Sequence, residues 1–415
     1  MVEVIGKVRG RGRGRGRGFV LVIVFVLLIV GCEKVVEPLA FSLPPEAAEL
    51  IESGNDFGLE LFKNILADAE SDENVMISPL SVSLALSMAY NGAEGETKIQ
   101  MEEVMKMTGL SVDQINDLNK KLVAALLAHD ASVTLEIANS IWYRNDFTVR
   151  PDFIGVNQKY YDAEVSSLDF TDPDTKDVIN GWVADKTHDK IMDIVDQISP
   201  ESFMFLINAI YFKGNWKWEF DPKSTYEGAF YVTDDETVPV SMMRQELNLN
   251  TLNNELFSAI ELPYGKGNWS MFIFLPRNNV VLDELTDELD SDKWDSWMSG
   301  FSPSKEVDIT IPAFTFEYET SLKKALISMG MEDAFTSAAN FNGILEGGGL
   351  QVSDVKHKTF IEVNEEGTEA AAVTSVEIEL TSVGNYFNAN RPFLFVIVEK
   401  SSNTILFSGR LSNPS

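Results

Sequence analysis

The stretch from Glu362 to Ser382 constrains the fold of this chain more than any other, because it combines a pivot, a strand pattern and a polar tip. Gly367 can adopt backbone angles that are closed to other residues, so it is a natural pivot. Beyond it, small and apolar residues occupy every second position, the spacing of a strand with one face toward a core. They are Thr368, Ala370, Ala372, Thr374, Val376, Ile378 and Leu380. A polar run over residues 381–385 then has the character of exposed loop. We predict a loop that can become a strand, although the period alone also fits an ordinary strand or a loose acidic loop.

The composition is typical of a globular chain and argues against nucleic-acid binding. With 415 residues the chain can bury a large core, and length alone predicts two or three domains. Hydrophobic residues make up 45% and charged residues 23%, which separates this chain from disordered ones. The formal net charge of −31 would repel nucleic-acid phosphates, so we expect no nucleic-acid partner.

The first 31 residues have the pattern of a signal peptide. Arginines alternate with glycine over residues 9–18, and residues 19–30 form an apolar run that is too short for a comfortable membrane span. The run ends at Gly31-Cys32, which resembles a bacterial lipoprotein signal in which the cysteine after the cleavage site is lipidated. Arg-Gly repeats also occur in RNA-binding tails, a rival interpretation that the adjoining apolar run disfavours.

We therefore predict export, with a lipid on Cys32 anchoring the protein to the membrane at the cell surface or in the extracellular space. Cys32 is the only cysteine, so no intrachain disulfide is possible. Residues 32–49 contain three prolines and no clear period, which is consistent with a tether.

The body of the chain starts with helical patterns. Ser78 before Pro79 is a good helix start, and the helix that follows is apolar nearly all round, so it should be buried. Ser81 on such a helix must be hydrogen-bonded. Further segments are predicted as helices over residues 50–66, 95–107 and 111–127 and as a strand over residues 133–143.

Several motifs in this body resemble those of the serpin family. They are the serine-rich helix start at residues 78–90, Gly92–Thr97, Asn208–Trp216, Glu261–Tyr264 with Met271–Pro276, Val355–Lys358 leading into Glu362–Ala372, Arg391–Phe395 and Leu406–Arg410. The resemblance implies one α+β domain over residues 50–415, with three β-sheets, about nine helices and an exposed reactive-centre loop at about residues 366–386. This single domain replaces the two or three domains predicted from length alone.

The family spacing implies a position for the reactive bond. Counting forward from Glu365 and counting back from Pro392 both give Thr381-Ser382, and a slip of one residue to Leu380-Thr381 stays open. No Lys or Arg occurs over residues 359–390, so a trypsin-like protease would find no cation to bind. A small Thr381 suits elastase-like or subtilisin-like serine proteases, and Leu380 would also suit papain-like cysteine proteases.

The resemblance implies a suicide-substrate inhibitor and assigns its working parts. After attack, the loop would insert into the central sheet and trap the acyl-enzyme. The implied hinge residues are Glu365, Gly367, Thr368, Ala370, Ala371 and Ala372, the implied shutter cluster is Ser78, Ser81, Asn208 and His357, and Trp216 is the implied breach residue where the loop enters. Taken without the family, Ser81 and Asn208 are ordinary core polar residues and Trp216 is a core aromatic.

One position departs from the family pattern. Serpins often carry Lys or Arg in a motif where this chain has Ile311-Pro312-Ala313-Phe314, and that cation pairs with the hinge glutamate. Ala313 cannot supply it, so Glu365 is either unbraced or braced by another residue.

Two rival functions remain at this stage. An enzyme is disfavoured because the three histidines, His129, His188 and His357, lie near no nucleophile or metal-ligand motif, so no metal or cofactor is expected. The second rival is a non-inhibitory serpin that acts as a binding protein or chaperone. The small residues Ala370, Ala371 and Ala372 of the implied hinge argue against it. Lys120-Lys121 is an isolated basic pair, so no basic patch for glycosaminoglycans is expected. We expect the protein to be a monomer.

Overall fold

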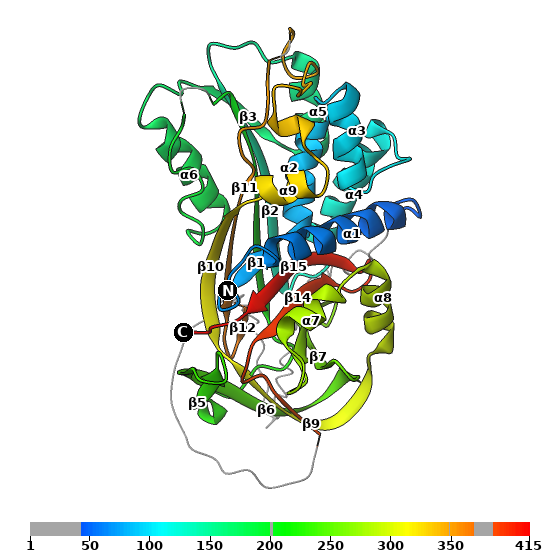
Figure 1. Ribbon diagram of the computed structural model, residues 1–415, viewed down its shortest axis with the longest axis vertical. Helices are drawn as coiled ribbons and strands as arrows, with labels where there is room; N and C mark the ends of the chain where they lie inside the picture. Colours follow the sequence, from blue (N-terminus) through cyan, green and yellow to red (C-terminus); the bar gives the residue numbers. More distant parts are fainter. Residues whose placement is uncertain (1–42, 200–201, 348, 369–384) are drawn as a thin grey trace, which may run out of the picture. The chain divides into compact units, whose positions relative to one another are not determined.

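A computed structural model describes residues 43–199, 202–347, 349–368 and 385–415, all within one compact unit, Pro38–Ser415. The signal segment, Cys32 and most of the tether lie outside these ranges, as do Ala370, Ala371, Ala372, Thr381 and Ser382. The described ranges contain nine α-helices (Figure 1), the number expected. They are α1 (Ala47–Leu66), α2 (Pro79–Tyr90), α3 (Gly95–Val104), α4 (Val112–Ala128), α5 (Pro151–Tyr161), α6 (Thr175–Lys186), α7 (Leu282–Asp287), α8 (Ser291–Gly300) and α9 (Lys323–Ser328).

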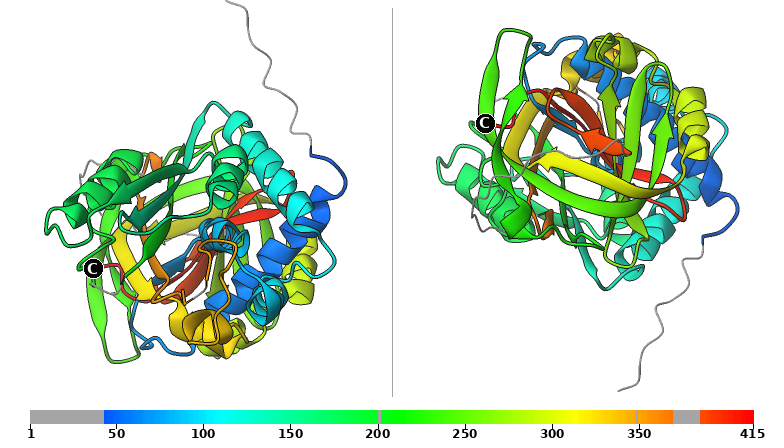
Figure 2. Two further views of the ribbon diagram at one scale, coloured as in Figure 1. Left: turned by 90° about the horizontal axis from the view of Figure 1, so that it is seen from above. Right: turned by 90° about the horizontal axis from the view of Figure 1, so that it is seen from below.

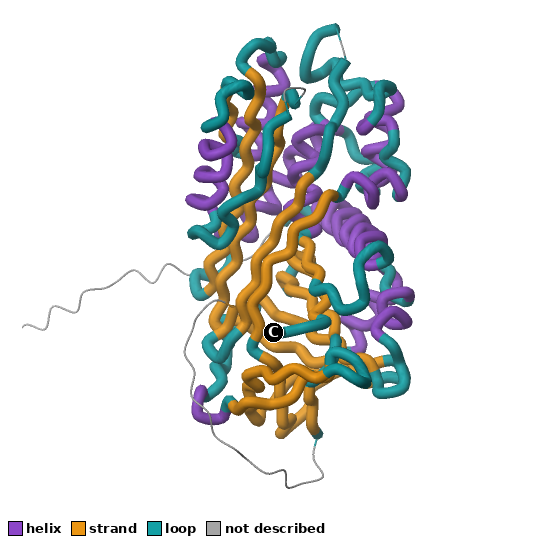
Figure 3. Tube along the Cα trace, turned by 60° about the vertical axis from the view of Figure 1, so that its left-hand side comes forward, coloured by secondary structure: helices purple, strands orange, loops and turns teal. Residues whose placement is uncertain are grey.

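A six-stranded sheet carries the hinge, with strand order β10-β11-β12-β4-β2-β3. Its strands are β2 (Val133–Arg144), β3 (Glu164–Leu168), β4 (Met204–Asn215), β10 (Phe314–Ser321), β11 (Lys356–Val363) and β12 (Gly367–Thr368). All neighbours pair antiparallel except β2 and β3, which are parallel. Figure 3 shows the long strands of this sheet side by side. The two-residue β12 lies between the much longer β4 and β11.

The other strands form a nine-stranded sheet in which β6 is the junction. The order is β1-β15-β14-β8-β7-β6-β9-β13, with β5 also paired to β6. The strands are β1 (Val75–Ile77), β5 (Tyr226–Tyr231), β6 (Thr237–Asn253), β7 (Phe257–Tyr264), β8 (Trp269–Pro276), β9 (Ser302–Pro312), β13 (Tyr386–Asn388), β14 (Phe393–Glu399) and β15 (Thr404–Leu411). Three sheets were expected, whereas two are hydrogen-bonded in the described ranges. The reason is that the long β6 bonds to β5 and β9 and then, at its end, to β7.

Helix α2 is the central element of the core, as its apolar circumference predicts. It begins at Pro79 after an extended Ser78, whose side chain accepts a hydrogen bond from the Ser81 N–H. It contacts α1, α4, α5, β4 and β15, and in Figure 2 (left) it is seen end-on among them. The predicted helices over residues 50–66, 95–107 and 111–127 and the strand over residues 133–143 are confirmed as α1, α3, α4 and β2.

The two faces of β4 pack against different neighbours. Ile210 and Phe212 belong to the main core, whereas Ile207 and Ala209 pack with Ile179 and other residues of α6 and the segment after it. This alternation follows from the two-residue period of a strand. Within the described ranges, no helix combines the length and the apolar character needed to span a bilayer.

Candidate functional site

Two of the predicted hinge residues, Gly367 and Thr368, already lie in the six-stranded sheet. Gly367 and Thr368 pair with Asn215 and Gly214 of β4, and Thr368 also pairs with Val363 of β11. Both hinge residues are buried. A pivot at Gly367, expected from sequence, therefore lies at the point where the chain turns back from β11 and enters between two strands.

Trp216 fixes this turn through its backbone and its ring. Its backbone N–H donates to Glu366 O at 2.8 Å, and its indole Nε1–H donates to Asn364 O at 2.9 Å. The ring is buried and stacks on Tyr264 with centroids 4.5 Å apart and planes 12° apart. Asn364 closes the turn from inside, since its N–H donates to Gly367 O at 2.8 Å and its Oδ1 accepts from the Glu366 N–H at 3.1 Å. The breach residue thus holds the hinge directly.

Gly367 is required by close contact with the neighbouring strand. A Cβ atom at this position would lie 2.1 Å from Gly214 O and 2.6 Å from the Asn215 Cα. Backbone atoms of a paired strand cannot move aside cheaply, so any side chain here would push the hinge out of the sheet.

Thr368 is held by a buried aromatic hydroxyl. The Tyr264 hydroxyl and Thr368 Oγ1 are 2.8 Å apart, and Tyr264 is fully buried. Burial raises the pKa of Tyr264 far above its ordinary range, so the hydroxyl keeps its proton and can donate. The first strand position of the hinge is therefore anchored on its core face.

A threonine supplies the bracing of Glu365 that Ala313 cannot. The Thr225 Oγ1–H donates to Glu365 Oε1 at 2.7 Å, and Thr225 and Glu365 are 3% and 6% exposed. The Phe220 N–H also donates to the Glu365 backbone carbonyl at 2.8 Å. The brace is an uncharged hydroxyl donor on the residue that follows the short 3-10 helix Pro222–Ser224, where the family pattern has a cation.

Thr225→Val should loosen this resting hinge. Valine keeps the shape but removes the donor, which leaves a buried glutamate oxygen without a described partner at a cost of about 1–3 kcal/mol. At about 2 °C per kcal/mol for a large domain, the thermal midpoint should fall by about 2–6 °C. Thr315→Val, at an exposed position of β10, is the matched control. Equal midpoints for the two variants would show that Thr225 braces nothing.

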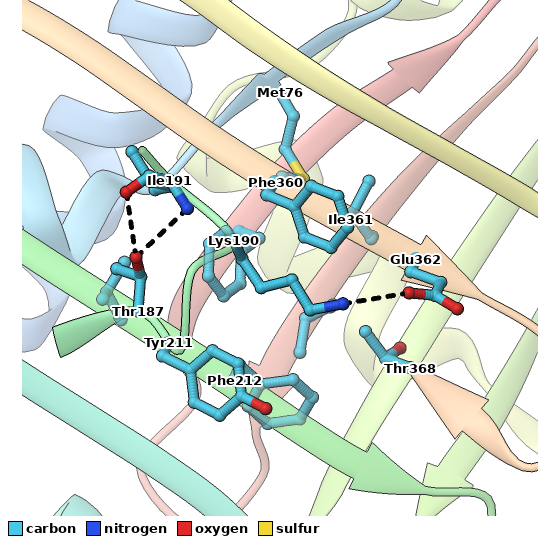
Figure 4. A pocket seen from close by; sticks show the side chains of 13 residues that line it. Met76, Thr187, Lys190, Ile191, Tyr211, Phe212, Phe360, Ile361, Glu362 and Thr368 are labelled. Carbon is cyan, nitrogen blue, oxygen red and sulfur yellow. Dashed lines mark hydrogen bonds and ion pairs between the residues drawn. The ribbon is translucent and has the colours of Figure 1, made fainter. Parts of the chain in front are cut away.

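A small cavity lies beyond Thr368 between β4 and β11 (Figure 4). Phe212 of β4 and Phe360 of β11 line it, together with Lys190 from the segment after α6. The Lys190 ammonium lies 3.3 Å from Glu362 Oε2 and 4.9 Å from the Phe360 ring centroid, and the dashed line in Figure 4 marks the ion pair. Among the described residues, side chains of β4, β11 and the segment after α6 therefore line the space next to Thr368.

The shutter cluster predicted from sequence is one connected group. The Ser78 N–H donates to His357 Nε2 at 3.0 Å, the Ser81 N–H donates to Ser78 Oγ at 3.3 Å, and the Ser81 hydroxyl donates to Asn208 O at 3.4 Å. The Asn208 Nδ2 donates to Asn139 Oδ1 at 2.8 Å, while the buried Asn208 Oδ1 has no hydrogen-bond partner in the described ranges. The cluster ties α2 to β4 and β11, and a cavity of about 340 Å³ adjoins it.

His357 makes this cluster sensitive to acid. Burial lowers the pKa of His357 to about 4, and its Nε2 accepts a hydrogen bond, so the ring is neutral with its proton on Nδ1. The folded-state pKa is below the ordinary value of about 6.5, so the unfolded chain binds the proton first as pH falls. The free energy of unfolding should therefore fall by about 3 kcal/mol as pH drops from about 6.5 to about 4.

The test is His357→Asn, which keeps an acceptor but does not titrate. Its thermal midpoint should fall less than that of the wild type between about pH 7 and about pH 4. His188→Asn, at a half-exposed side chain, should follow the wild type. A His357→Asn midpoint that falls as steeply as the wild type's would contradict the assignment.

The structure thus brings two groups of predicted residues together along the space between β4 and β11. At the β12 end lie Glu365, Gly367, Thr368 and Trp216. Midway along these strands lie Ser78, Ser81, Asn208 and His357. Sequence reasoning missed Thr225, Tyr264 and Gly214. Tyr264 stood in a quoted motif, but nothing in its spacing indicates that its hydroxyl reaches residue 368, and Thr225 lies 140 residues from its partner.

Comparison with known proteins gives a consistent match. Residues 52–414 match the family model described as "Serpin (serine protease inhibitor)". An uncharacterized serpin-like protein of Methanosarcina mazei is 36% identical over 383 residues, covering 88% of each chain. Human plasminogen activator inhibitor 2 is 34% identical over 407 residues, covering 86% of this chain and 98% of the relative.

Two solved structures extend the match to the fold. The native state of tengpin, a thermophilic serpin, superposes with a TM-score of 0.79 at 34% identity, over 90% of this chain and 95% of that one. Human thyroxine-binding globulin in complex with its hormone superposes with a TM-score of 0.80 at 28% identity, over 89% of this chain and 100% of that one. A plasminogen activator inhibitor and a thyroxine-binding globulin are thus both among the similar proteins.

Proposed function

Because the chain belongs to the serpin family, we propose that it is an irreversible suicide-substrate inhibitor of elastase-like or subtilisin-like serine endopeptidases. The protease attacks Thr381-Ser382, and the loop then inserts into the six-stranded sheet before the acyl-enzyme is hydrolysed. Papain-like cysteine proteases are secondary targets in this proposal, because Leu380 suits their preference. The inhibitor is consumed in the reaction.

The observation that carries this proposal is the unfilled edge beyond β12. In the described ranges β12 pairs with only two residues of β4 and one of β11. Residues 204–213 of β4 pair with β2 on one side and with no described strand on the other. Residues 356–362 of β11 likewise pair only with β10. A strand entering here would gain ladder bonds on both of its edges.

The pairing register of β12 with β4 predicts which residues would lie opposite each other if β12 were extended. Thr368 lies opposite Gly214, so continued antiparallel pairing would set Ala370 opposite Phe212 and Ile378 opposite Met204. Opposed residues point to the same face, so the small and apolar residues at even positions would enter the main core. The odd positions, with Glu369, Glu377 and Glu379, would face α6 and solvent.

The same register gives Thr374 a partner. It would lie opposite Asn208, whose buried Oδ1 has no hydrogen-bond partner in the described ranges. A threonine hydroxyl there could donate to this oxygen, so the inserted state would satisfy a group that the resting state leaves unpaired.

Insertion should release enough free energy to displace a tethered protease. Roughly a dozen new ladder bonds at about 1 kcal/mol each, with burial of the even-numbered side chains, exceed about 10 kcal/mol. Residues 368–380 would extend roughly 43 Å at about 3.3 Å per residue. The protease, still bound through Thr381, would be carried that far and distorted.

Incubation with a pancreatic-type elastase tests the proposal. An SDS-stable complex of the two chains is expected, whereas trypsin should form none because the loop lacks a basic residue. Thr381→Arg should transfer trapping to trypsin, and Leu380→Arg is the matched control one residue away. Trapping of trypsin by Leu380→Arg alone would move the reactive bond to Leu380-Thr381, and cleavage of the wild type without any complex would refute inhibition.

A binding protein is the alternative function, and one observation favours it. The matched thyroxine-binding globulin structure contains bound thyroxine, so a similar fold can bind a small ligand. Under that alternative, elastase would cut the loop of this chain and leave active enzyme.

We also propose that the protein is exported and anchored through Cys32. Wild-type protein expressed in a lipoprotein-processing bacterium should incorporate radiolabelled fatty acid and partition with membranes, because two acyl chains anchor stably where one does not. Cys32→Ser should incorporate none and appear in the soluble fraction. Unlabelled wild-type protein would end the anchoring proposal without affecting the inhibitory one.

A further inference from the structure

A second cavity, of about 790 Å³, lies at the end of the nine-stranded sheet. None of the shutter residues lines it. It is open to solvent on one side and is lined by the end of β6, the facing ends of β7 and β8, part of β9, and the chain from Asn385 through β13 to Arg391. Arg277, directly after β8, and Arg391, two residues before the start of β14, both line it. A concave site of this volume suits a small molecule.

The charge of this cavity is opposite to that of the chain. The protein has 64 acidic and 33 basic residues, yet no carboxylate is among the lining residues that the structure describes. Neither Arg277 nor Arg391 makes an ion pair with any residue in the described ranges. Burial lowers the pKa of Arg391, and the positive charge of Arg277 lowers it further. Two half-buried guanidinium groups that repel each other and have no anion beside them in the described ranges are electrostatically uncompensated there.

Both guanidinium groups are held in place and retain donors for a ligand. The Arg277 Nε–H donates to Asn254 O at 3.0 Å, and the Arg391 Nη2–H donates to Pro276 O. Each arginine has five N–H donors, so several on each group have no partner in the described ranges. The Asn388 Oδ1 lines the same cavity and is buried without a hydrogen-bond partner in those ranges, and rotation of its amide would present two more donors.

We propose that this cavity binds a small organic dicarboxylate, with one carboxylate on each of Arg277 and Arg391. Guanidinium groups bind carboxylates through paired N–H···O bonds, which favours a planar carboxylate over a spherical anion. Ile260, Leu275 and Val307 provide an apolar wall that would contact the carbon chain between the two carboxylates. Asn253 and Asn278 add neutral polar groups at the same site.

Isothermal titration of the full chain with succinate tests the proposal. Saturable one-to-one binding is expected, with succinamide, the uncharged analogue, binding at least about ten-fold more weakly, the loss expected when charge-assisted bonds become neutral ones. Arg277→Gln should weaken succinate binding by about ten-fold or more, while Lys98→Gln on α3 should leave it unchanged. Sulfate is the second probe, and affinity equal to that of succinate would overturn the dicarboxylate assignment.

Chemical labelling of the unmutated protein keeps the test independent of folding defects. Phenylglyoxal modifies accessible arginines, and succinate should protect Arg277 and Arg391 but not Arg150, whose position is remote in the fold and exposed. No saturable succinate binding, or binding without protection of either cavity arginine, would overturn the proposal. Because neither measurement uses a protease, these results are independent of whether the chain is an inhibitor.

Discussion

Replacing Thr368 with arginine should convert the protein from an inhibitor into a substrate. Thr368 is 5% exposed, pairs with both flanking strands and lies 2.8 Å from the Tyr264 hydroxyl, so the seat has no room or partner for a guanidinium group. The arginine would therefore leave this seat in the resting state, and insertion would have to bury it there. Burying an unpaired charge costs several kcal/mol, and about 4 kcal/mol added to the barrier for insertion slows that step about a thousand-fold. Hydrolysis of the acyl-enzyme then precedes insertion.

The measurement is the number of inhibitor molecules consumed for each protease inactivated, together with the yield of SDS-stable complex. Thr368→Arg should be cleaved at the reactive bond and release active protease, with almost no complex. Ala372→Arg, four positions further along the same face of the predicted strand, should behave in the same way. Thr315→Arg, exposed on β10 of the same sheet, is the matched control and should trap protease normally. Stoichiometric inhibition by both hinge variants would remove insertion from the mechanism.

Cutting the loop should raise the thermal stability of the wild type by about 20 °C. The resting sheet leaves residues 204–213 of β4 without a described strand on one side, and the freed segment from Thr368 would fill that edge. A gain of about 10 kcal/mol corresponds to about 20 °C at about 2 °C per kcal/mol for a domain of this size. The cut should be made with a metalloprotease, which forms no acyl-enzyme and so leaves the product free.

Differential scanning calorimetry of cut and uncut protein gives the answer. The thermal midpoint of Thr368→Arg should stay nearly unchanged on cutting, because its hinge cannot be buried. That control separates insertion from a general effect of cleavage. A wild-type midpoint that does not rise would mean that the resting fold stores no free energy.

Features that depend on a few neighbouring residues, such as the start of a helix or a glycine pivot, were predictable from sequence. Ser78 and Pro79 mark the start of α2 because a side-chain cap and a missing N–H both suit the first turn of a helix, and the structure begins the helix at that point. Gly367 was identified as a pivot from its backbone freedom, and the structure adds that Gly214 O leaves no space for a Cβ atom. The division into three sheets was less accurate, because whether β6 bonds continuously across two groups of strands depends on its partners, not on its own pattern.

The sequence by itself determined the buried central helix, the period-two pattern after Gly367, the lack of a basic residue over residues 359–390 and the serpin resemblance, because each depends on residues close together in the chain. Only the tertiary structure decided that Thr225 braces Glu365 in place of a cation, that Tyr264 anchors Thr368, and that Arg277 and Arg391 share one cavity. These contacts join residues more than 100 positions apart, and hydrogen bonds at 2.7 or 2.8 Å depend on packing that no local pattern encodes.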